Sequence, residues 1–396
     1  MMSVWSSLVG QEAAVAKLSD AAASARAIVA SRGGRASDEA RSMSHAWLIT
    51  GPPGSGRSVA ARAFAAALQC TGETPGCGQC PGCRTTMART NADVVFAATE
   101  TSIINVDTAR SLVLQAQSSP SQGLWRVIVV EDADRLGESG ANALLKAIEE
   151  PPEHTVWLLC APSPEDMIAT IRSRCRHLGL RIPTAAAVAD LLVREGVATP
   201  DVALDAARAA QSHIGLARAL ARDPQMRERR RAIITAPASV RSVGEAVMAA
   251  DRLLETAKAQ ADAQVSERNA REKAELLRQL GMEEGESATK ASRTMIRQLE
   301  EDQKRRSKRA LTDAIDRALI DLLAIYRDVL MVQVGGDGEL INTDLSDLVH
   351  QIAQDSTPRQ TLARVDHIET ARKRLVSNGN ALLVLEDMAI SLRPQA

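Results

Sequence analysis

The segment Gly51-Pro52-Pro53-Gly54-Ser55-Gly56-Arg57-Ser58 constrains this chain more than any other stretch of its sequence. It follows the pattern G-x-x-x-x-G-K-[ST], in which backbone N–H groups cradle phosphates, a lysine reaches the β- and γ-phosphates and a hydroxyl holds Mg²⁺. An apolar run at 47–50 precedes it, and an Ala-rich stretch with helical spacing follows at 58–68. Strand, loop and helix in this order are the context that the motif requires. The sequence therefore predicts a phosphate-binding loop rather than a surface turn.

The loop departs from the pattern at one position, where Arg57 replaces the lysine. A lysine offers a compact point charge, whereas an arginine brings a wide planar fork. In a loop built for close backbone approach, the fork should crowd the phosphate or point away. We therefore expect weak nucleotide binding, and hydrolysis should suffer more because it depends on positioning. The predicted nucleotide contacts in the loop are Gly51, Gly54, Gly56, Arg57 and Ser58.

A second departure concerns Glu131 and Asp132, which directly follow an apolar run at 127–130. After such a strand in a P-loop protein, acidic residues coordinate Mg²⁺ and polarise the attacking water. The usual order is Asp for the metal and then Glu for the water, and here it is reversed. Each carboxylate is displaced by about a bond length, and errors of about 1 Å can cost ~10²-fold in rate. We expect both residues to take part in a weak ATP and Mg²⁺ site.

Four of the six cysteines lie close together, at Cys70, Cys77, Cys80 and Cys83. Gly and Pro residues surround the last three, so tight turns can aim the sulfurs inward. Four thiolates suit a closed tetrahedral Zn²⁺ site with no vacant position for catalysis. Disulfides are the weaker interpretation in a reducing cytoplasm. We predict a structural zinc site in an insertion at 70–83, and a core position for Cys160.

Composition excludes several classes of protein. No apolar run approaches ~18 residues and no basic-then-apolar signal opens the chain, so we expect a cytoplasmic protein. Lys and Arg number 48 against 49 for Asp and Glu, a formal net charge of −1, so no global field favours nucleic acid. The length of 396 residues gives room for two or three domains.

Strand and helix patterns alternate along the first part of the chain. Further apolar runs of strand type are at 93–96, 127–130 and 156–160, and helical spacing is at 106–117 and 142–150. This alternation predicts a parallel α/β sheet over residues 1–182, with an exposed loop at 26–44.

Beyond Pro183 helical patterns take over, with Thr184 as the expected N-cap of the first helix. We expect a small helical domain at 183–225 and a helical domain at 226–396. The segment 255–303 is dense in Ala, Glu, Lys and Arg and is broken at Gly281 and Gly285, which predicts a solvated helical hairpin. Two apolar stripes should pack on partners or on the chain itself. They are Leu311, Ile315, Leu319, Leu322, Tyr326, Val329 and Leu330, and then Leu382, Leu385, Met388 and Leu392.

The chain resembles bacterial clamp-loader subunits of the AAA+ class over about residues 3–225. The resemblance rests on five segments: 5–12, which looks like an adenine-side motif, the cysteine knuckle, and the runs at 131–136, 142–152 and 171–175. It implies an α/β P-loop AAA+ domain with a zinc knuckle, a helical lid domain and an all-α C-terminal collar domain. It also implies gamma/tau and delta subunits as partners, with the sliding clamp and primed DNA reached through the complex.

Within that family the departures favour the delta-prime branch, the stator of the DNA polymerase III loader. Arg57 and the reversed acidic pair are joined by a strand end, 160–163, that lacks the Thr or Asn of a first sensor. The resemblance implies that Arg174 is a finger offered to the nucleotide of a neighbouring subunit. It also implies that Arg218 is a phosphate-side contact of a second sensor.

Two alternatives belong to other classes. One is a working gamma/tau-like ATPase in which Arg57 substitutes for the lysine. The other is a zinc-bearing DNA-binding module, which the neutral net charge and the closed set of four cysteines argue against.

Overall fold

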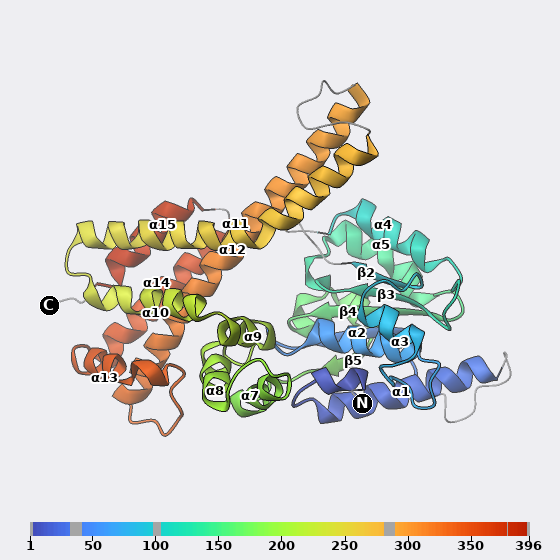
Figure 1. Ribbon diagram of the computed structural model, residues 1–396, viewed down its shortest axis with the longest axis horizontal. Coiled ribbons are helices and arrows are strands. Elements are labelled where there is room, and N and C mark those ends of the chain that lie inside the picture. Colours follow the sequence, from blue (N-terminus) through green and yellow to red (C-terminus); the bar gives the residue numbers. More distant parts are fainter. Residues whose placement is uncertain (1–2, 32–41, 98–103, 281–289, 378, 394–396) are drawn as a thin grey trace. The chain divides into compact units, whose positions relative to one another are not determined.

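The computed structural model describes residues 3–31, 42–97, 104–280, 290–377 and 379–393 (Figure 1). The chain divides into two compact units, residues 1–218 and 219–396. The first unit holds a five-stranded sheet with its helices, and the described residues of the second form helices and connecting turns alone. None of the helices in these described ranges combines the length and the apolarity needed to cross a membrane.

The sheet of the first unit is parallel throughout, with the strand order β2-β3-β4-β1-β5. Its strands are β1 (Ala46–Thr50), β2 (Val94–Ala97), β3 (Arg126–Val130), β4 (Thr155–Ala161) and β5 (Arg176–Gly179). Because β1 and β3 both flank β4, the loop after β1, the end of β4 and the acidic residues after β3 emerge side by side at one edge of the sheet.

The four strands expected from apolar runs are confirmed, with bounds shifted by at most a residue or so. No apolar run predicts β5, which pairs with β1 at the edge of the sheet. Only Leu178 of this strand is buried, and its other residues are exposed. An edge strand of this kind carries no apolar run, so its sequence pattern does not predict a strand.

Alternate side chains of the central strands enter two separate cores. Those on one face pack under α1 (Glu12–Ala30) and α2 (Arg57–Leu68), and those on the other under α4 (Val106–Ala116) and α5 (Glu138–Glu149) (Figure 1). The first face carries Trp47, Ile49, Val127, Val129, Val156, Leu158 and Cys160, and the second Ala46, Leu48, Ile128, Val130, Trp157, Leu159 and Ala161. The core position predicted for Cys160 is confirmed, and burial raises the pKa of its thiol to about 12.

Helix α2 approaches the sheet closely because small side chains cover most of its surface. Its buried alanines are Ala60, Ala61, Ala63, Ala65, Ala66 and Ala67. Alanine combines a high helix propensity with little bulk. The one large side chain among them, Phe64, meets Trp47 of β1 edge-on, with ring centroids 5.3 Å apart. The phosphate-loop motif is thus attached to a helix that is fixed on the sheet.

The loop expected at 26–44 is wrong over its first residues, because α1 continues to Ala30. The guanidinium of Arg26 donates to the carbonyl oxygens of Glu73 at 2.7 Å and Cys70 at 3.0 Å. These bonds hold the last turns of α1 against the segment that follows α2. Residues 32–41 lie outside the described residues.

The helical segment after the sheet begins as expected. The Thr184 hydroxyl caps α7 (Ala185–Arg194) by accepting the N–H of Ala187 at 3.2 Å. Helix α8 (Pro200–Ala209) packs on α7 and leads into α9 (Ile214–Arg222). The boundary between the two compact units falls inside α9. The division into 1–182, 183–225 and 226–396 therefore stays a prediction.

The second unit contains a long helical hairpin, as the sequence predicts. Its helices are α10 (Pro224–Ser239), α11 (Val243–Gln279), α12 (Lys290–Gln333), α13 (Ser346–Gln354), α14 (Pro358–Val376) and α15 (Ala381–Ser391). Helices α11 and α12 lie side by side, and Ala261, Val265 and Ala310 bury a small contact between them (Figure 1). The expected breaks at Gly281 and Gly285 lie outside the described residues.

The two apolar stripes predicted in this unit face its own core. Ile315, Leu319, Leu322, Tyr326, Val329, Leu385, Met388 and Leu392 are all buried there. Of the two expectations, packing on the chain itself is the one that holds. The buried residues of the stripes are therefore not available as contacts to other subunits, because the unit needs them to exclude water from its own interior.

Asp93, just before β2, is fully buried and organises the turn that enters β3. Its carboxylate accepts the backbone N–H groups of Ser121 at 2.6 Å, Gln122 at 2.8 Å and Gly123 at 2.6 Å. Arg126 lies 3.5 Å from the same carboxylate. Burial acts to raise the pKa of Asp93, but the backbone donors outweigh it and hold the pKa below its usual value.

We predict that Asp93→Asn lowers the free energy of unfolding by about 2–4 kcal/mol at neutral pH, since an amide NH₂ would face backbone donors. The stability that the carboxylate contributes is present above the unfolded pKa of about 4 and is lost as the pH falls through the lower folded pKa. The variant should therefore lose less stability in acid than the wild type. Urea unfolding at pH 7 and pH 3 measures both effects. The exposed Asp20→Asn is the control, with an expected change below about 0.5 kcal/mol.

Candidate functional site

The phosphate-loop motif joins the end of β1 to the N-terminus of α2. The N–H of Gly51 donates to the carbonyl oxygen of Pro162 just beyond β4, at 3.1 Å, and the N–H of Ser55 donates to that of Pro52 at 3.1 Å. The first bond ties the loop to the neighbouring strand. The loop thus opens a helix N-terminus, where backbone N–H groups favour anions.

Gly54 brings the loop into direct contact with the helical segment that follows the sheet. Its φ is +89°, and a Cβ there would lie 2.9 Å from the Cα of His213. His213 lies in the turn between α8 and α9, where Gln211 and Ser212 also have positive φ. Sequence reasoning misses His213, because a single histidine before a helix carries no motif.

Gln11 is a second residue that the sequence analysis does not single out, although it belongs to the motif at 5–12. It is buried, and its side-chain amide donates to the carbonyl oxygen of Arg181 at 2.5 Å and accepts the N–H of Arg181 at 3.2 Å. The same amide nitrogen lies 3.4 Å from the carbonyl oxygen of Ser55. Gln11 therefore fixes the N-terminal motif beside the phosphate loop.

The side chain of Arg57 turns back on its own loop. Its guanidinium donates a short hydrogen bond to the carbonyl oxygen of Gly51. The guanidinium is thus held by its own loop. The positively charged group at the position of the lysine therefore binds a loop carbonyl oxygen.

Glu131 is also engaged within the chain. Its carboxylate lies 2.6 Å from the guanidinium of Arg89, and only 12% of the Glu131 side chain is exposed. The same guanidinium lies over the ring of Phe96, 5.0 Å from its centroid. Asp132 begins the short turn at Ala133–Arg135.

The residues expected to hold Mg²⁺ and the nucleotide phosphates thus fit that task poorly. Arg57 and Glu131 contact other groups of the chain, and the β4 end offers a buried Cys160 where a polar sensor is expected. What the loop retains is its backbone cradle.

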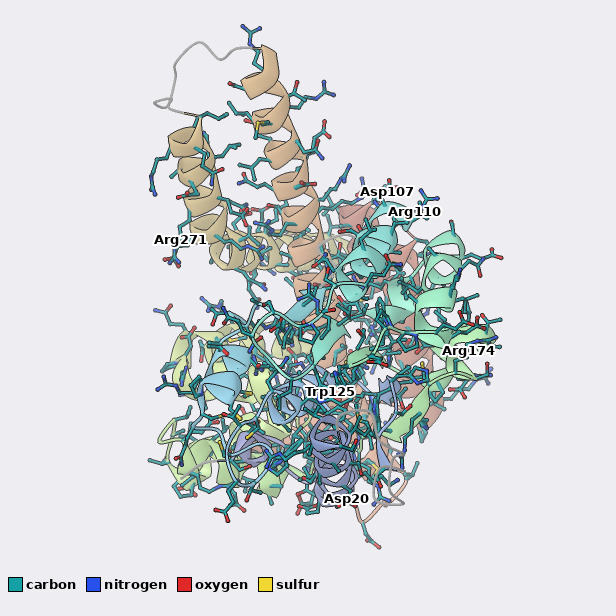
Figure 2. The ribbon with its side chains drawn as sticks, turned by 90° about the vertical axis from the view of Figure 1, so that its right-hand side faces the viewer. Asp20, Asp107, Arg110, Trp125, Arg174 and Arg271 are labelled. Carbon is teal, nitrogen blue, oxygen red and sulfur yellow. The ribbon has the colours of Figure 1, made fainter. Side chains whose placement is uncertain are left out.

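Arg174 follows α6 (Ala169–Arg172) and lies at the surface of the first unit (Figure 2). Its guanidinium pairs with the carboxylate of Glu149 and donates to the carbonyl oxygen of Thr170 at 2.8 Å. The side chain is 38% exposed. Arg174 is therefore oriented by its own chain and still open to an external partner.

Arg218 on α9 makes a two-pronged pair with Glu195 at the end of α7. Its Nε and Nη2 atoms lie 2.9 Å from the two carboxylate oxygens. This geometry uses the planar fork to join the two helices. The contact to a phosphate expected of Arg218 stays a prediction.

The four clustered cysteines come together in space. The sulfur atoms of Cys70, Cys77, Cys80 and Cys83 all lie within 4.8 Å of one another. Cys70 follows α2, and α3 (Pro81–Met87) begins directly after Cys80. Backbone N–H groups of Cys80 and Cys83 point at the sulfurs of Cys77 and Cys80, both at 3.4 Å. Burial opposes ionisation of Cys80, but the backbone donors of Cys83 and Thr71 lower its pKa to about 6.

This group of sulfurs fits a metal ion. A tetrahedral ion with metal–sulfur bonds of about 2.3 Å separates its sulfur ligands by about 3.8 Å. The sulfurs of Cys70 and Cys80 are 3.9 Å apart. Helix α3 also packs tightly on the end of α2, since a Cβ on Gly82 would lie 2.0 Å from the carbonyl oxygen of Gln69. The four cysteines could thus hold a metal ion at a site fixed to α2.

Residues 35–184 match the family model described as DNA polymerase III, delta subunit. The DNA polymerase III subunit delta' of Pseudomonas aeruginosa is 36% identical over 161 residues, which are 40% of this chain and 48% of that protein. That of Escherichia coli is 35% identical over 182 residues, 44% of this chain and 54% of that protein. Over this part of its length the chain is similar to the delta-prime subunits of DNA polymerase III.

The delta-prime family shares this likeness with the gamma/tau subunits. The DNA polymerase III subunit gamma/tau of Mycobacterium tuberculosis is 35% identical over 170 residues, 41% of this chain and 29% of that protein. The chain spans about half the length of the delta-prime relatives and less of the gamma/tau relative. The chain is about equally identical to the delta-prime and the gamma/tau relatives, so identity alone does not distinguish between the two subunit types. The contacts of the site residues bear on that distinction.

We predict that this protein purifies with one metal ion per chain on its four cysteines. Replacing a thiolate by a hydroxyl in Cys80→Ser removes a soft ligand, so the bound metal should fall from about one to below about 0.2 per chain. Cys175→Ser, outside the group, should retain the metal. Elemental analysis after gel filtration measures the ratio. A full equivalent of metal in Cys80→Ser would contradict the assignment.

Proposed function

We propose that the chain is the stator subunit of a DNA polymerase III clamp loader and helps load the sliding clamp onto primed DNA. One contrast carries the proposal. Arg57 and Glu131 of the chain's own nucleotide site are engaged by Gly51 and Arg89, whereas Arg174 is exposed. A subunit with this combination serves a neighbour's ATP site better than its own.

Arg174 is the proposed arginine finger. An arginine supplied in trans stabilises the charge of a transferring phosphoryl group and accounts for ~10³–10⁵ in rate in other NTPases. The bonds to Glu149 and Thr170 limit the motion of a long side chain before any partner arrives. Less conformational entropy is then lost when the guanidinium meets a phosphate.

Zn²⁺ is the metal proposed for the cysteine group. Four thiolates with a tetrahedral spacing favour Zn²⁺ or iron–sulfur chemistry over harder cations, and a closed set of protein ligands indicates a structural site. The ion would tie Cys70, at the end of α2, to Cys80 and Cys83 of α3. It would thereby stiffen the segment between the phosphate loop and β2.

The proposed partners are the gamma/tau and delta subunits, with the clamp and primed DNA reached through the assembled loader. Similarity of the first unit to clamp-loader subunits supports this proposal. The first unit would act as the AAA+ domain with its helical lid, and the second as an all-α collar. Since most residues of the apolar stripes fill the core of the second unit, other surfaces of that unit would contact neighbouring subunits.

A gamma/tau-like ATPase is the second candidate, and the identity to the gamma/tau subunit of Mycobacterium tuberculosis favours it. In that case the purified chain should bind Mg-ATP in the micromolar range and hydrolyse it without other subunits. The engagement of Arg57 by Gly51 leads us to expect neither. Equilibrium binding of labelled ATP and a phosphate-release assay on the isolated chain distinguish the two candidates.

The finger role predicts a specific loss in the reconstituted loader. Arg174→Ala should lower the rate of DNA-stimulated ATP hydrolysis, because the guanidinium acts on the transition state. The loss should equal at least about the part of the total rate that comes from the single ATP site next to this subunit. Arg174→Lys keeps the charge without the fork and should recover little of the rate.

The control is Arg172→Ala, an exposed arginine on the same short helix. Gel filtration establishes that each variant still assembles. An unchanged rate of ATP hydrolysis in an intact loader carrying Arg174→Ala would overturn the proposed role.

A further inference from the structure

Arg89 has a backbone conformation that favours glycine. It follows Ala88, the C-cap of α3, and its φ is +59°. Helices often end with a left-handed residue at this place, and it is usually a glycine because a Cβ is disfavoured there. Non-glycine residues held in this region occur where the surroundings over-determine them, often at functional sites. The contacts of the Arg89 side chain are therefore expected to hold this conformation in place.

Those contacts centre on one carboxylate. The guanidinium lies 2.6 Å from Glu131 and 5.0 Å from the centre of the Phe96 ring. Arg62 of α2 also lies within electrostatic range of Glu131, and its Nε is buried without a hydrogen-bond partner among the described residues. Cations from two separate segments thus face the largely buried Glu131 side chain.

Helix α3, which begins within the cysteine group, positions Arg89 next to Glu131. Helix α3 starts at the Cys80 cap, and the N–H of Arg89 donates to the carbonyl oxygen of Thr86 at 3.0 Å. The next residue is held as well, since the N–H of Thr90 donates to Thr85 at 2.9 Å. A continuous run of backbone hydrogen bonds therefore connects the cysteines to the position of Arg89.

Glu131 is the first acidic residue after β3, where a P-loop protein places its Mg²⁺ ligand. Mg²⁺ demands a near-ideal octahedral shell and a carboxylate that is free to enter it. A guanidinium in contact with this carboxylate occupies its oxygen and repels a divalent cation. We infer that Arg89 is a resident cation that takes the place of Mg²⁺ at the acidic end of β3.

This inference separates two causes of a poor nucleotide site. Arg57 and the reversed acidic pair would weaken the site whatever Arg89 does. If Arg89 excludes the metal, removing its side chain alone should restore metal binding. Arg89→Gly is the suitable variant, because glycine takes the left-handed conformation without strain and the fold should be retained.

The test titrates Mn²⁺, a paramagnetic substitute for Mg²⁺, into the purified full chain and follows the free-ion signal by electron paramagnetic resonance. We expect Arg89→Gly to bind one Mn²⁺ at least about tenfold more tightly than the wild type, since a cation next to the carboxylate has been removed. Arg84→Ala, an exposed arginine of the same helix α3, is the matched control and should behave as the wild type.

A double variant identifies the site of any gain. Arg89→Gly combined with Glu131→Gln should return Mn²⁺ binding to the wild-type level, because the ligand itself is then neutral. Equal binding by the wild type and a folded Arg89→Gly, judged by circular dichroism, would overturn the inference. So would a gain that persists in the double variant. The assay uses the isolated chain, so its outcome is independent of the arginine-finger test in the assembled loader.

Discussion

The close packing of α2 against the sheet is the constraint on which the site depends. A helix of twelve residues, Arg57–Leu68, is about 18 Å long. Its first turn carries the phosphate loop, and Cys70 follows its last turn. Because alanines let this helix sit directly on β1, β3 and β4, the loop and the cysteine group are held at a fixed separation on one rigid element. Neither site can move without disturbing the core between them.

The charged side chains of the candidate nucleotide site are paired with other groups of the same chain. Arg57 is paired with a carbonyl of its own loop, Glu131 with Arg89, and Arg218 with Glu195. In an active P-loop protein, the groups at the positions of Arg57 and Glu131 contact the nucleotide or its metal, and here both are occupied by contacts within the chain. Binding a nucleotide here would first require breaking such contacts, and that cost is subtracted from the affinity. Arg174 differs because its pairing leaves part of the side chain exposed.

Sequence reasoning found the features that depend on local pattern and missed those that depend on tertiary partners. Apolar runs located β1 to β4, and cysteine spacing predicted a group that does come together. The edge strand β5 was not predicted, because a single buried residue makes no apolar pattern. Helix α1 extends beyond its expected end, and Arg26 near that end is bonded to carbonyl oxygens more than forty residues away in sequence. Nothing in the local sequence around Arg89 reveals its left-handed backbone or its partner across the sheet edge.

The loop has a structural role that does not depend on hydrolysis. Gly51 bonds to the segment after β4, Gly54 packs against His213, and Ser55 lies beside Gln11. These contacts join the sheet, the helical segment after it and the N-terminal motif at a single turn of backbone. A change that abolished the loop would therefore loosen three parts of the unit. The replacement of lysine by Arg57 affects only the partner of one positive charge. The contacts that hold the loop are made by its backbone and by Gly54 and Ser55, so they do not depend on which side chain stands at position 57.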